Sequence, residues 1–311
     1  MIRVEKLTKD FDGFKAVNQL DLSVSPGEVL GFLGPNGAGK STTMKMLTGF
    51  LKPTSGNISV FDIDVLQNPK AAQQLIGYLP EGAPAYQEMT VRGFLNFIAD
   101  IRGLQGEIKR KRLDIVIDQV ELSGVLDKPI ENLSKGFARR VGLAQAIIHD
   151  PQVLILDEPT DGLDPNQKHQ VRELIKGLAK DKIVIISTHI LEEVSAVCTR
   201  AVIINQGKLL LDGEPQTLER ESRHHNAIQL QLESDVEEAE DQLSQITGID
   251  AVEVLGERQY MLFPENGSMQ LPQLVRFLDE NKWPVENLHL EKGRLEDVFR
   301  QVTSRHNHGQ D

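Results

Sequence analysis

The glycine-rich run at residues 34–41, GPNGAGKS, constrains this chain more than any other part of its sequence. It satisfies the pattern GxxxxGK[ST], and it lies between a short apolar run at 29–33 and a helical pattern at 42–50. Glycines let successive backbone N–H groups turn inward, and the dipole of a following helix favours anions, so such a loop cradles phosphates. We therefore predict a strand, a phosphate loop and a helix, in which Lys40 reaches the β- and γ-phosphates and the Ser41 hydroxyl ligates Mg²⁺.

Composition is that of an ordinary globular protein. The chain has 311 residues, of which 40% are hydrophobic and 26% are charged, and its length suits one large domain with a smaller one. The single cysteine, Cys198, forms no intramolecular disulfide and no thiolate cluster for zinc, so a cytosolic location is expected. No apolar run approaches the roughly 20 residues of a membrane helix, so we expect any membrane span to come from another polypeptide.

The excess negative charge lies at the C-terminal end. Residues 221–311 contain 18 acidic and 8 basic side chains, a net charge of −10 out of −12 for the whole chain. Binding to a phosphate backbone needs a basic surface, so no nucleic-acid partner is expected there. A well-solvated surface is the preferred interpretation.

The first 215 or so residues alternate short apolar runs with helical patterns, which is typical of an α/β layered domain. Buried strands are predicted at 29–33, 153–156 and 183–186, and an antiparallel layer is predicted from 2–6 and 57–61. The remaining predicted elements are helices at 91–102, 109–120, 166–179 and 190–198 and a hairpin at 201–213.

Polar residues 219–226, ERESRHHN, predict a linker, after which the pattern changes. Strands at 227–232, 251–255, 259–263 and 285–290 enclose helices at 236–246 and 271–281. That βαββαβ order is the ferredoxin-like arrangement. Four histidines are interpreted as exposed linker or tail residues rather than a metal site: His224, His225, His306 and His308.

Two carboxylates follow the strand predicted at 153–156. Asp157 and Glu158 would therefore lie at the C-terminal edge of the sheet, where ligands bind in α/β folds. We expect Asp157 to hold the metal and Glu158 to orient or deprotonate the attacking water. By itself, an apolar strand that ends in two carboxylates is as often purely structural as functional. The phosphate loop upstream favours the functional interpretation here.

His189 lies at another predicted strand end, between IVIIS and an amphipathic helix. A neutral imidazole there can hydrogen-bond the γ-phosphate and hold the water. A lone histidine more often has a structural role, but this constellation favours the functional one.

These motifs together resemble the ATP-binding cassette (ABC) ATPases. Residues 133–137, LSKGF, resemble the signature LSGGQ found only in that family, although Lys135 and Phe137 depart from it. The phosphate loop, the signature, the acidic strand end, Leu163-Asp164 and the stretch ending at His189 follow the order of the family over roughly residues 1–215.

The resemblance implies a role for each matching residue. Phe11 matches the aromatic residue that stacks on adenine, and Glu81 replaces the usual Gln that contacts Mg²⁺ and senses the membrane partner. Ser134 and Gly136 keep the hydroxyl and the unhindered backbone that the signature uses on the γ-phosphate. The expected catalytic residues are Glu158, His189 and Lys40, and the expected metal ligands are Ser41, Asp157 and Glu81. The expected nucleotide-binding residues are Phe11, Gly34, Pro35, Asn36, Gly37, Ala38, Gly39, Lys40, Ser41, Thr42, Glu81, Ser134, Gly136 and Asp164.

In this family the signature of one copy completes the nucleotide site of another, so the resemblance implies a head-to-tail homodimer around two ATP molecules. The expected fold is an α/β P-loop cassette with a mostly parallel core sheet, an antiparallel layer and a helical subdomain at about 83–150. The expected domains are the cassette at 1–220, a linker at 221–226, a small α+β accessory domain at 227–303 and a polar tail at 304–311.

Details of the motifs resemble the ATP-binding subunits of ABC-2 exporters, especially the gliding-motility and sodium- or drug-efflux cassettes. These details are IGYLPEGAPAY, LSKGF, PTDGLDP and the closing LEDVF. The resemblance implies a Mg-dependent ATPase on the inner face of the cell membrane, whose separate permease subunits insert coupling helices beside Glu81 and residues 83–100. DNA-repair types carry long coiled-coil insertions, whereas here 92 residues without sustained heptads separate Ser41 from Ser134. A soluble regulatory ATPase without permease partners remains the alternative.

Overall fold

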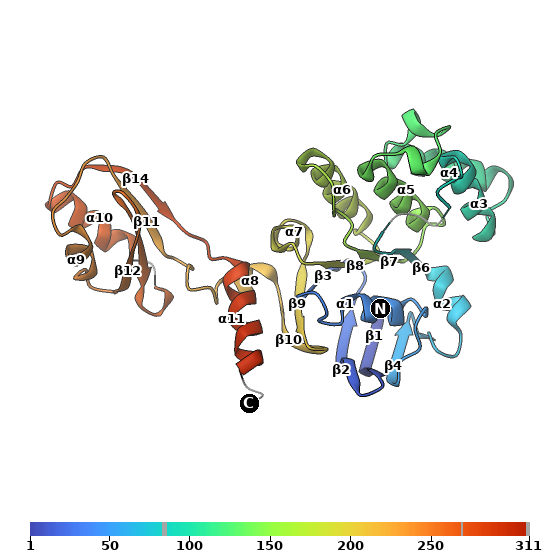
Figure 1. Ribbon diagram of the computed structural model, residues 1–311, viewed down its shortest axis with the longest axis horizontal. Coiled ribbons are helices and arrows are strands. Elements are labelled where there is room, and N and C mark those ends of the chain that lie inside the picture. Colours follow the sequence, from blue (N-terminus) through green and yellow to red (C-terminus); the bar gives the residue numbers. More distant parts are fainter. Residues whose placement is uncertain (83–85, 269, 309–311) are drawn as a thin grey trace. The chain divides into compact units, whose positions relative to one another are not determined.

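The computed structural model describes residues 1–82, 86–268 and 270–308 in two compact units (Figure 1). The first unit is Met1–Glu214, and the second begins at Pro215. The boundary therefore falls after Glu214 rather than after residue 220, because helix α8 (Pro215–Glu219) packs with α11 (Leu295–His308) in the second unit.

The first unit is organised around a six-stranded sheet with the order β10-β9-β3-β8-β7-β6. The neighbours from β9 to β6 pair in parallel, and β9 and β10 form the predicted hairpin. Strands buried on both faces are apolar throughout, which explains the runs that the sequence shows. The strands are β3 (Val29–Leu33), β6 (Ile76–Leu79), β7 (Val153–Asp157), β8 (Ile183–Thr188), β9 (Arg200–Asn205) and β10 (Lys208–Gly213).

A second, four-stranded sheet has the order β2-β1-β4-β5 and pairs antiparallel throughout, which confirms the predicted antiparallel layer. Its buried side chains and those of β3 share one core with the first helix, α1. The strands are β1 (Ile2–Phe11), β2 (Phe14–Val24), β4 (Ser55–Val60) and β5 (Ile63–Asp64).

Helices complete the first unit, and α3, α4 and α5 gather on one side of the large sheet (Figure 1). The helices predicted at 91–102, 109–120, 166–179 and 190–198 are present, whereas α5 and strand β6 were not predicted. The helices are α1 (Lys40–Leu47), α2 (Pro69–Leu75), α3 (Val91–Ile101), α4 (Gly106–Gln119), η1 (Ser123–Val125), η2 (Ile130–Asn132), α5 (Lys135–Ile147), α6 (Pro165–Leu178) and α7 (Leu191–Val197).

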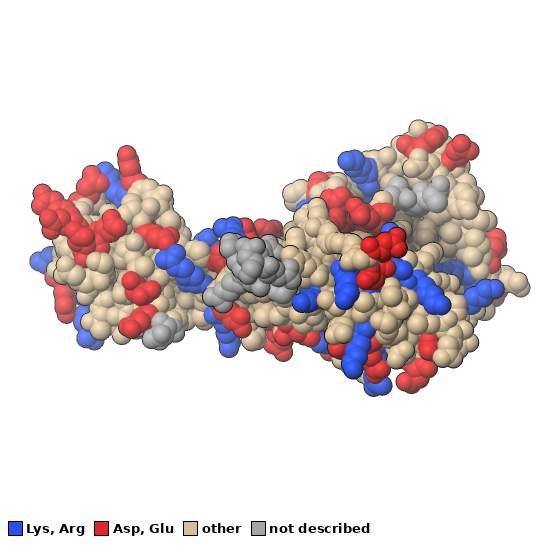
Figure 2. Space-filling model, turned by 60° about the horizontal axis from the view of Figure 1, so that its bottom comes forward, with Lys and Arg blue, Asp and Glu red and all other residues tan. Residues whose placement is uncertain are grey.

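The second unit contains the predicted βαββαβ order in an antiparallel sheet, β12-β13-β11-β14. Its own apolar cluster includes Leu230, Leu243, Leu262 and Leu274. Acidic side chains predominate on the face of this unit that Figure 2 shows. The elements are β11 (Ile228–Leu232), α9 (Ala239–Ser244), β12 (Ile249–Gly256), β13 (Gln259–Pro264), η3 (Glu265–Gly267), α10 (Leu271–Glu280) and β14 (Val285–Leu290).

One expectation for the second unit was wrong. His224 is not an exposed linker residue, because its Nδ1 lies 2.6 Å from Oδ2 of Asp297, which also accepts a hydrogen bond from the buried Ser222 at 2.7 Å. The expected polar tail is in part helical, since α11 continues to His308. Within the residues described, no helix has the length and apolar character that crossing a membrane requires.

Candidate functional site

The loop between β3 and α1 has the backbone shape of a phosphate cradle. Gly37 and Gly39 have φ angles of 81° and 105°, in the region that favours glycine. A Cβ atom on Gly39 would lie 2.3 Å from the carbonyl oxygen of Ala16, and one on Gly34 would lie 2.6 Å from that of Ile204. The first turn of α1 carries no acidic side chain, so its free N–H groups and its dipole suit an anion.

Lys40 is the first residue of α1, and only 6% of its surface is exposed. Its Nζ donates hydrogen bonds to the carbonyl oxygens of Gly34 at 2.7 Å and Pro35 at 3.2 Å. Burial lowers the pKa of Lys40, and the nearby charges of Glu158, Asp157 and Glu81 oppose that shift. The ammonium is thus bonded to the phosphate loop and is under the electrostatic influence of the carboxylates that follow or end β6 and β7.

A cleft of about 460 Å³ brings this loop together with residues from distant parts of the chain. Its lining includes two aromatic residues of the β1–β2 hairpin, Phe11 and Phe14, which are both exposed and pair in register. Phe14 and Ala16 were not predicted; an exposed aromatic residue three positions after Phe11 is the signal that the sequence offered. The lining residues are Phe11, Phe14, Ala16, Asn36, Gly37, Gly39, Lys40, Ser41, Thr42, Glu81, Glu158 and His189.

Three adjacent parallel strands deliver the acidic and imidazole groups to one edge of the sheet. β6 pairs with β7 and β7 with β8, so the residues that follow these strands lie close together. Asp157 ends β7 and is buried, and the Glu158 backbone N–H donates to the carbonyl of Ser187 at 2.8 Å. Nδ1 of His189 lies 2.9 Å from Oε1 of Glu158.

A buried carboxylate behind these residues was missed from the sequence. Glu193 of α7 accepts hydrogen bonds from the hydroxyl groups of Thr160 and Thr188, the latter at 3.2 Å. The Thr188 hydroxyl in turn accepts from the Ile190 N–H at 3.0 Å. Glu193 therefore ties the loop after Glu158 to the loop that carries His189.

The donor set fits Mg²⁺ bound together with a nucleotide. Ser41 lines the cleft, and the Asp157 carboxylate acts electrostatically on Lys40. Across the described part of the chain, no three His, Cys, Asp or Glu side chains form a metal-binding group. Mg²⁺ usually takes one or two protein carboxylates together with substrate phosphates and water, so a preformed protein cage is not required.

The signature residues lie elsewhere. Ser134 caps the N-terminus of α5 by accepting from the Phe137 N–H at 3.4 Å, and Asp164 caps α6 by accepting from the Gln167 N–H at 2.9 Å. A Cβ atom on Gly136 would lie 2.4 Å from Oε1 of Gln167. As far as the structure describes the chain, these predicted nucleotide-binding residues do not line the cleft.

A second, larger groove of about 650 Å³ is lined by residues of α2, β6, α3 and α5 and by Thr48 and Phe50, which follow α1. Two apolar side chains at this groove are unusually exposed, Phe50 at 70% and Ile101 at 64%. Two buried polar atoms there, Oη of Tyr78 and Nδ1 of His149, have no hydrogen-bond partner among the described residues. Burial, with the charges of Asp157 and Glu81, raises the pKa of Tyr78 to about 12.

Comparison with known proteins gives consistent matches. The family model described as ABC transporter matches residues 17–161. The chain is 35% identical over 301 residues to the bacitracin transport ATP-binding protein BcrA of Bacillus licheniformis, covering 96% of each chain. It is 32% identical over 305 residues to the Nod factor export ATP-binding protein I of Burkholderia pseudomallei, covering 98% of this chain and 97% of that protein.

In two further matches, the similarity covers a smaller share of one of the two proteins compared. The chain is 38% identical over 198 residues to ABC transporter A family member 1 of Dictyostelium discoideum, but it spans only 23% of that protein. A solved structure described as the ATP binding subunit of an ABC transporter matches with a TM-score of 0.66 and 29% identity, over 71% of this chain and 92% of that one.

Proposed function

This chain belongs to the ABC transporter family as an ATP-hydrolysing cassette, and from that premise we propose that it is the motor subunit of an exporter. In this proposal two copies enclose two Mg·ATP molecules and drive separate permease subunits from the inner face of the cell membrane. The observation that supports it best is the cleft itself, because a phosphate loop, exposed aromatic residues and the bonded pair of Glu158 and His189 line one space.

The arrangement suits hydrolysis by an activated water molecule. A carboxylate can only accept, so the bond to Glu158 requires the proton on Nδ1 of His189. Nε2 of a neutral imidazole is then an acceptor, which can bind the attacking water but cannot donate the hydrogen bond to the γ-phosphate expected from the sequence. Glu158 keeps a second oxygen that can accept a proton from the attacking water. Bound Mg²⁺ would neutralise charge on the phosphates, with Ser41 and Asp157 as the protein ligands.

The place of the signature supports a pair of copies. Ser134, Gly136 and Asp164 lie at the N-terminal ends of α5 and α6 and outside the cleft of their own chain. We assign them to the γ-phosphate held by a second, head-to-tail copy. Each copy then lacks part of its nucleotide site until the pair forms.

The groove beside α3 has the chemistry of a docking site for a permease helix. Phe50 and Ile101 offer an exposed apolar surface at this groove. We therefore propose that a short amphipathic helix of the permease enters this groove. The expected coupling segment at 83–100 falls partly on residues 83–85, which lie outside the described residues.

Export is proposed because the names of two relatives describe bacitracin transport and Nod factor export. The second unit is proposed as a regulatory element, because its sequence contains no phosphate-loop pattern and it has an apolar cluster of its own. Its negative charge disfavours close approach to anionic lipid headgroups.

Co-purification from native membranes tests the proposal. The wild-type chain should retain polytopic membrane proteins, and the double variant Phe50→Asp with Ile101→Asp should lose them while keeping its basal ATPase activity. Val254 and Val275 of the second unit are similarly exposed, so replacing them with Asp provides a matched control. Recovery of soluble partners alone would support the regulatory alternative.

A further inference from the structure

One buried arginine joins the two strand ends that carry the proposed hydrolytic residues. Arg139 lies on α5, and only 8% of its surface is exposed. Its Nη1 donates to the carbonyl oxygens of Pro80 at 2.9 Å and Gly82 at 3.1 Å. Its Nη2 donates to the carbonyl oxygens of Asp157 and Glu158. The guanidinium thus binds the backbone on both sides of Glu81 and at Glu158 itself.

The backbone that Arg139 holds is unusual at Glu158. Glu158 has a φ angle of 50°, which is uncommon for a residue with a side chain and requires support from its surroundings. Buried carbonyl groups also need donors, and a planar guanidinium supplies several in a fixed geometry. Arg139 therefore meets both requirements at the strand end from which the Glu158 side chain enters the cleft.

The guanidinium donates to backbone oxygens, while Oε1 of Glu158 pairs with His189. It holds the backbone from which the Glu158 carboxylate projects without taking the oxygen that bonds to the imidazole. Arg139 also lines a pocket of about 280 Å³ together with Glu81, Glu158 and Asp161. Residues that follow β6 and β7 therefore meet at this pocket.

We propose that Arg139 is a positioning residue that orients Glu158 and Glu81 together and couples them to the signature helix. This inference rests on the proposed roles of Glu158 and Glu81. Ser134, which we assign to the nucleotide of the second copy, precedes Arg139 by five residues, or about 7.5 Å along a helix. A shift of α5 when the second copy binds therefore reaches both carboxylates through one side chain.

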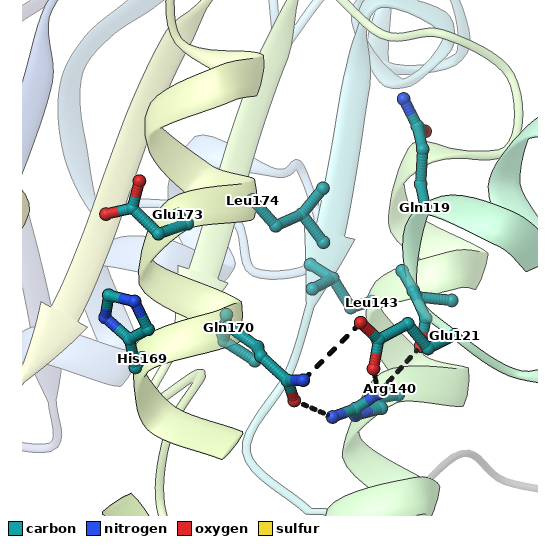
Figure 3. Close-up of a pocket in the computed structure, with 10 residues that line it drawn as sticks. Gln119, Glu121, Arg140, Leu143, His169, Gln170, Glu173 and Leu174 are labelled. Atoms are coloured by element: carbon teal, nitrogen blue, oxygen red, sulfur yellow. Dashed lines mark hydrogen bonds and ion pairs between the residues drawn. The ribbon is translucent and has the colours of Figure 1, made fainter. Parts of the chain in front are cut away.

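The adjacent residue provides a matched control. Arg140 is similarly buried, at 9% exposure, but its guanidinium faces the pocket of about 310 Å³ between the end of α4, α5 and α6 (Figure 3). It donates to Glu121 Oε2 at 2.7 Å and to Oε1 of Gln170. Replacing Arg140 thus removes a buried arginine from the same helix without touching either strand end.

The test compares Arg139→Gln, Arg139→Lys, Arg140→Gln and Glu158→Gln in the full chain, by kcat, KM for Mg·ATP and thermal unfolding. We expect Arg139→Gln to lower kcat about 10- to 100-fold with KM within about twofold, because small displacements of a reacting group cost this much. Arg139→Lys should recover part of the rate, since it keeps a cation but not the fork. Arg140→Gln should lower the Tm by a similar amount and keep kcat within about threefold.

Epistasis separates positioning from general stability. If Arg139 acts through Glu158, the double variant Arg139→Gln with Glu158→Gln should be no slower than Glu158→Gln alone. If Arg139→Gln and Arg140→Gln have the same kcat while Glu158→Gln is inactive, the proposed role of Arg139 is wrong but the proposed base stands. Wild-type turnover in Glu158→Gln would overturn the proposed base and with it the role of Arg139.

Discussion

Nδ1 of His189 lies 2.9 Å from Oε1 of Glu158, so a hydrogen bond closes the gap between the ends of β7 and β8. The two residues differ in exposure, since 51% of the His189 side chain but only 17% of the Glu158 side chain is accessible. Glu158 is therefore held within the fold, whereas the imidazole faces the cleft where a phosphate would lie. In the proposed mechanism, Glu158 is therefore a base held in place by the fold, and His189 is an accessible hydrogen-bonding group beside it.

Replacing Glu158 with Gln keeps the shape of the side chain but removes its basicity. We expect Mg·ATP binding to persist while turnover falls by about 10²- to 10⁴-fold, which is the range for loss of a general base. Because the bound nucleotide is no longer hydrolysed, the pair of copies should accumulate as an ATP-bound dimer. Steady-state ATPase assays and analytical ultracentrifugation with ATP measure the two effects. Turnover at the wild-type rate would place the base at another residue.

Glu81 is an exposed carboxylate at the edge of both the cleft and the pocket beside Arg139. If Glu81 senses the permease, Glu81→Gln should leave the basal ATPase rate nearly unchanged but weaken its stimulation by the membrane subunits. If Glu81 also ligates the metal, the apparent Mg²⁺ affinity should fall as well. A magnesium titration of ATPase activity, with and without reconstituted permease, distinguishes these roles. If neither quantity changes, the Glu at position 81 replaces the usual Gln of the family without functional effect.

Segments that are marked by a short contiguous sequence pattern could be predicted from the sequence. The phosphate loop has a fixed glycine spacing, and β7 and β8 are short apolar runs bounded by polar residues, so these strand ends could be predicted. The structure brings Glu158 and His189 into one cleft and buries Asp157 at the end of β7. Phe11 could be placed only through the family resemblance. The position of Phe14 beside it depends on the pairing of β1 with β2, which was not predicted.

The elements that were missed lack a periodic signal for physical reasons. β6 is four residues long and contains Gly77, where a Cβ atom would lie 2.0 Å from the carbonyl oxygen of Ala146, so close packing of α5 requires glycine there. α5 is buried on most of its surface, including Arg139 and Arg140, and therefore shows no amphipathic pattern. Glu193 has the sequence context of a surface residue, and only the tertiary fold buries it.

The buried Glu193 should control both stability and turnover. Glu193→Ala leaves the hydroxyls of Thr160 and Thr188 without their acceptor, at a cost of about 1–3 kcal/mol for each. It also loosens the two loops that carry Glu158 and His189, so kcat should fall by more than KM changes. Glu192, the exposed neighbour on α7, provides the control, and Glu192→Ala should leave both quantities unchanged. Equal behaviour of the two variants in thermal unfolding and ATPase assays would contradict this role.

His149 should make the stability of the first unit depend on pH. Burial and the nearby Arg102 lower the pKa of His149 to about 4, and its Nε2 lies 3.2 Å from the carbonyl of Ile76. The unfolded chain binds a proton near pH 6.5 that the folded chain does not bind, so stability is lost as the pH falls from about 6.5 to 4. Denaturant titrations across this range should show a loss on the order of 2 kcal/mol in the wild type and a smaller one in His149→Phe. The exposed His169→Phe should keep the wild-type slope; a wild-type slope in His149→Phe would contradict the assignment.

Truncation after Glu214 should leave a folded cassette that binds ATP. The first unit keeps both of its sheets and the whole cleft, while the second unit has an apolar cluster of its own around Leu230, Leu262 and Leu274. We expect the truncated chain to bind a non-hydrolysable ATP analogue with an affinity close to that of the full chain, and to differ in dimerisation or regulation. A truncation after Arg220 should be less stable, because it keeps α8 without its partner α11. Circular dichroism establishes folding and calorimetry measures binding; a folded truncated chain that cannot bind the analogue would show that the second unit takes part in the nucleotide site.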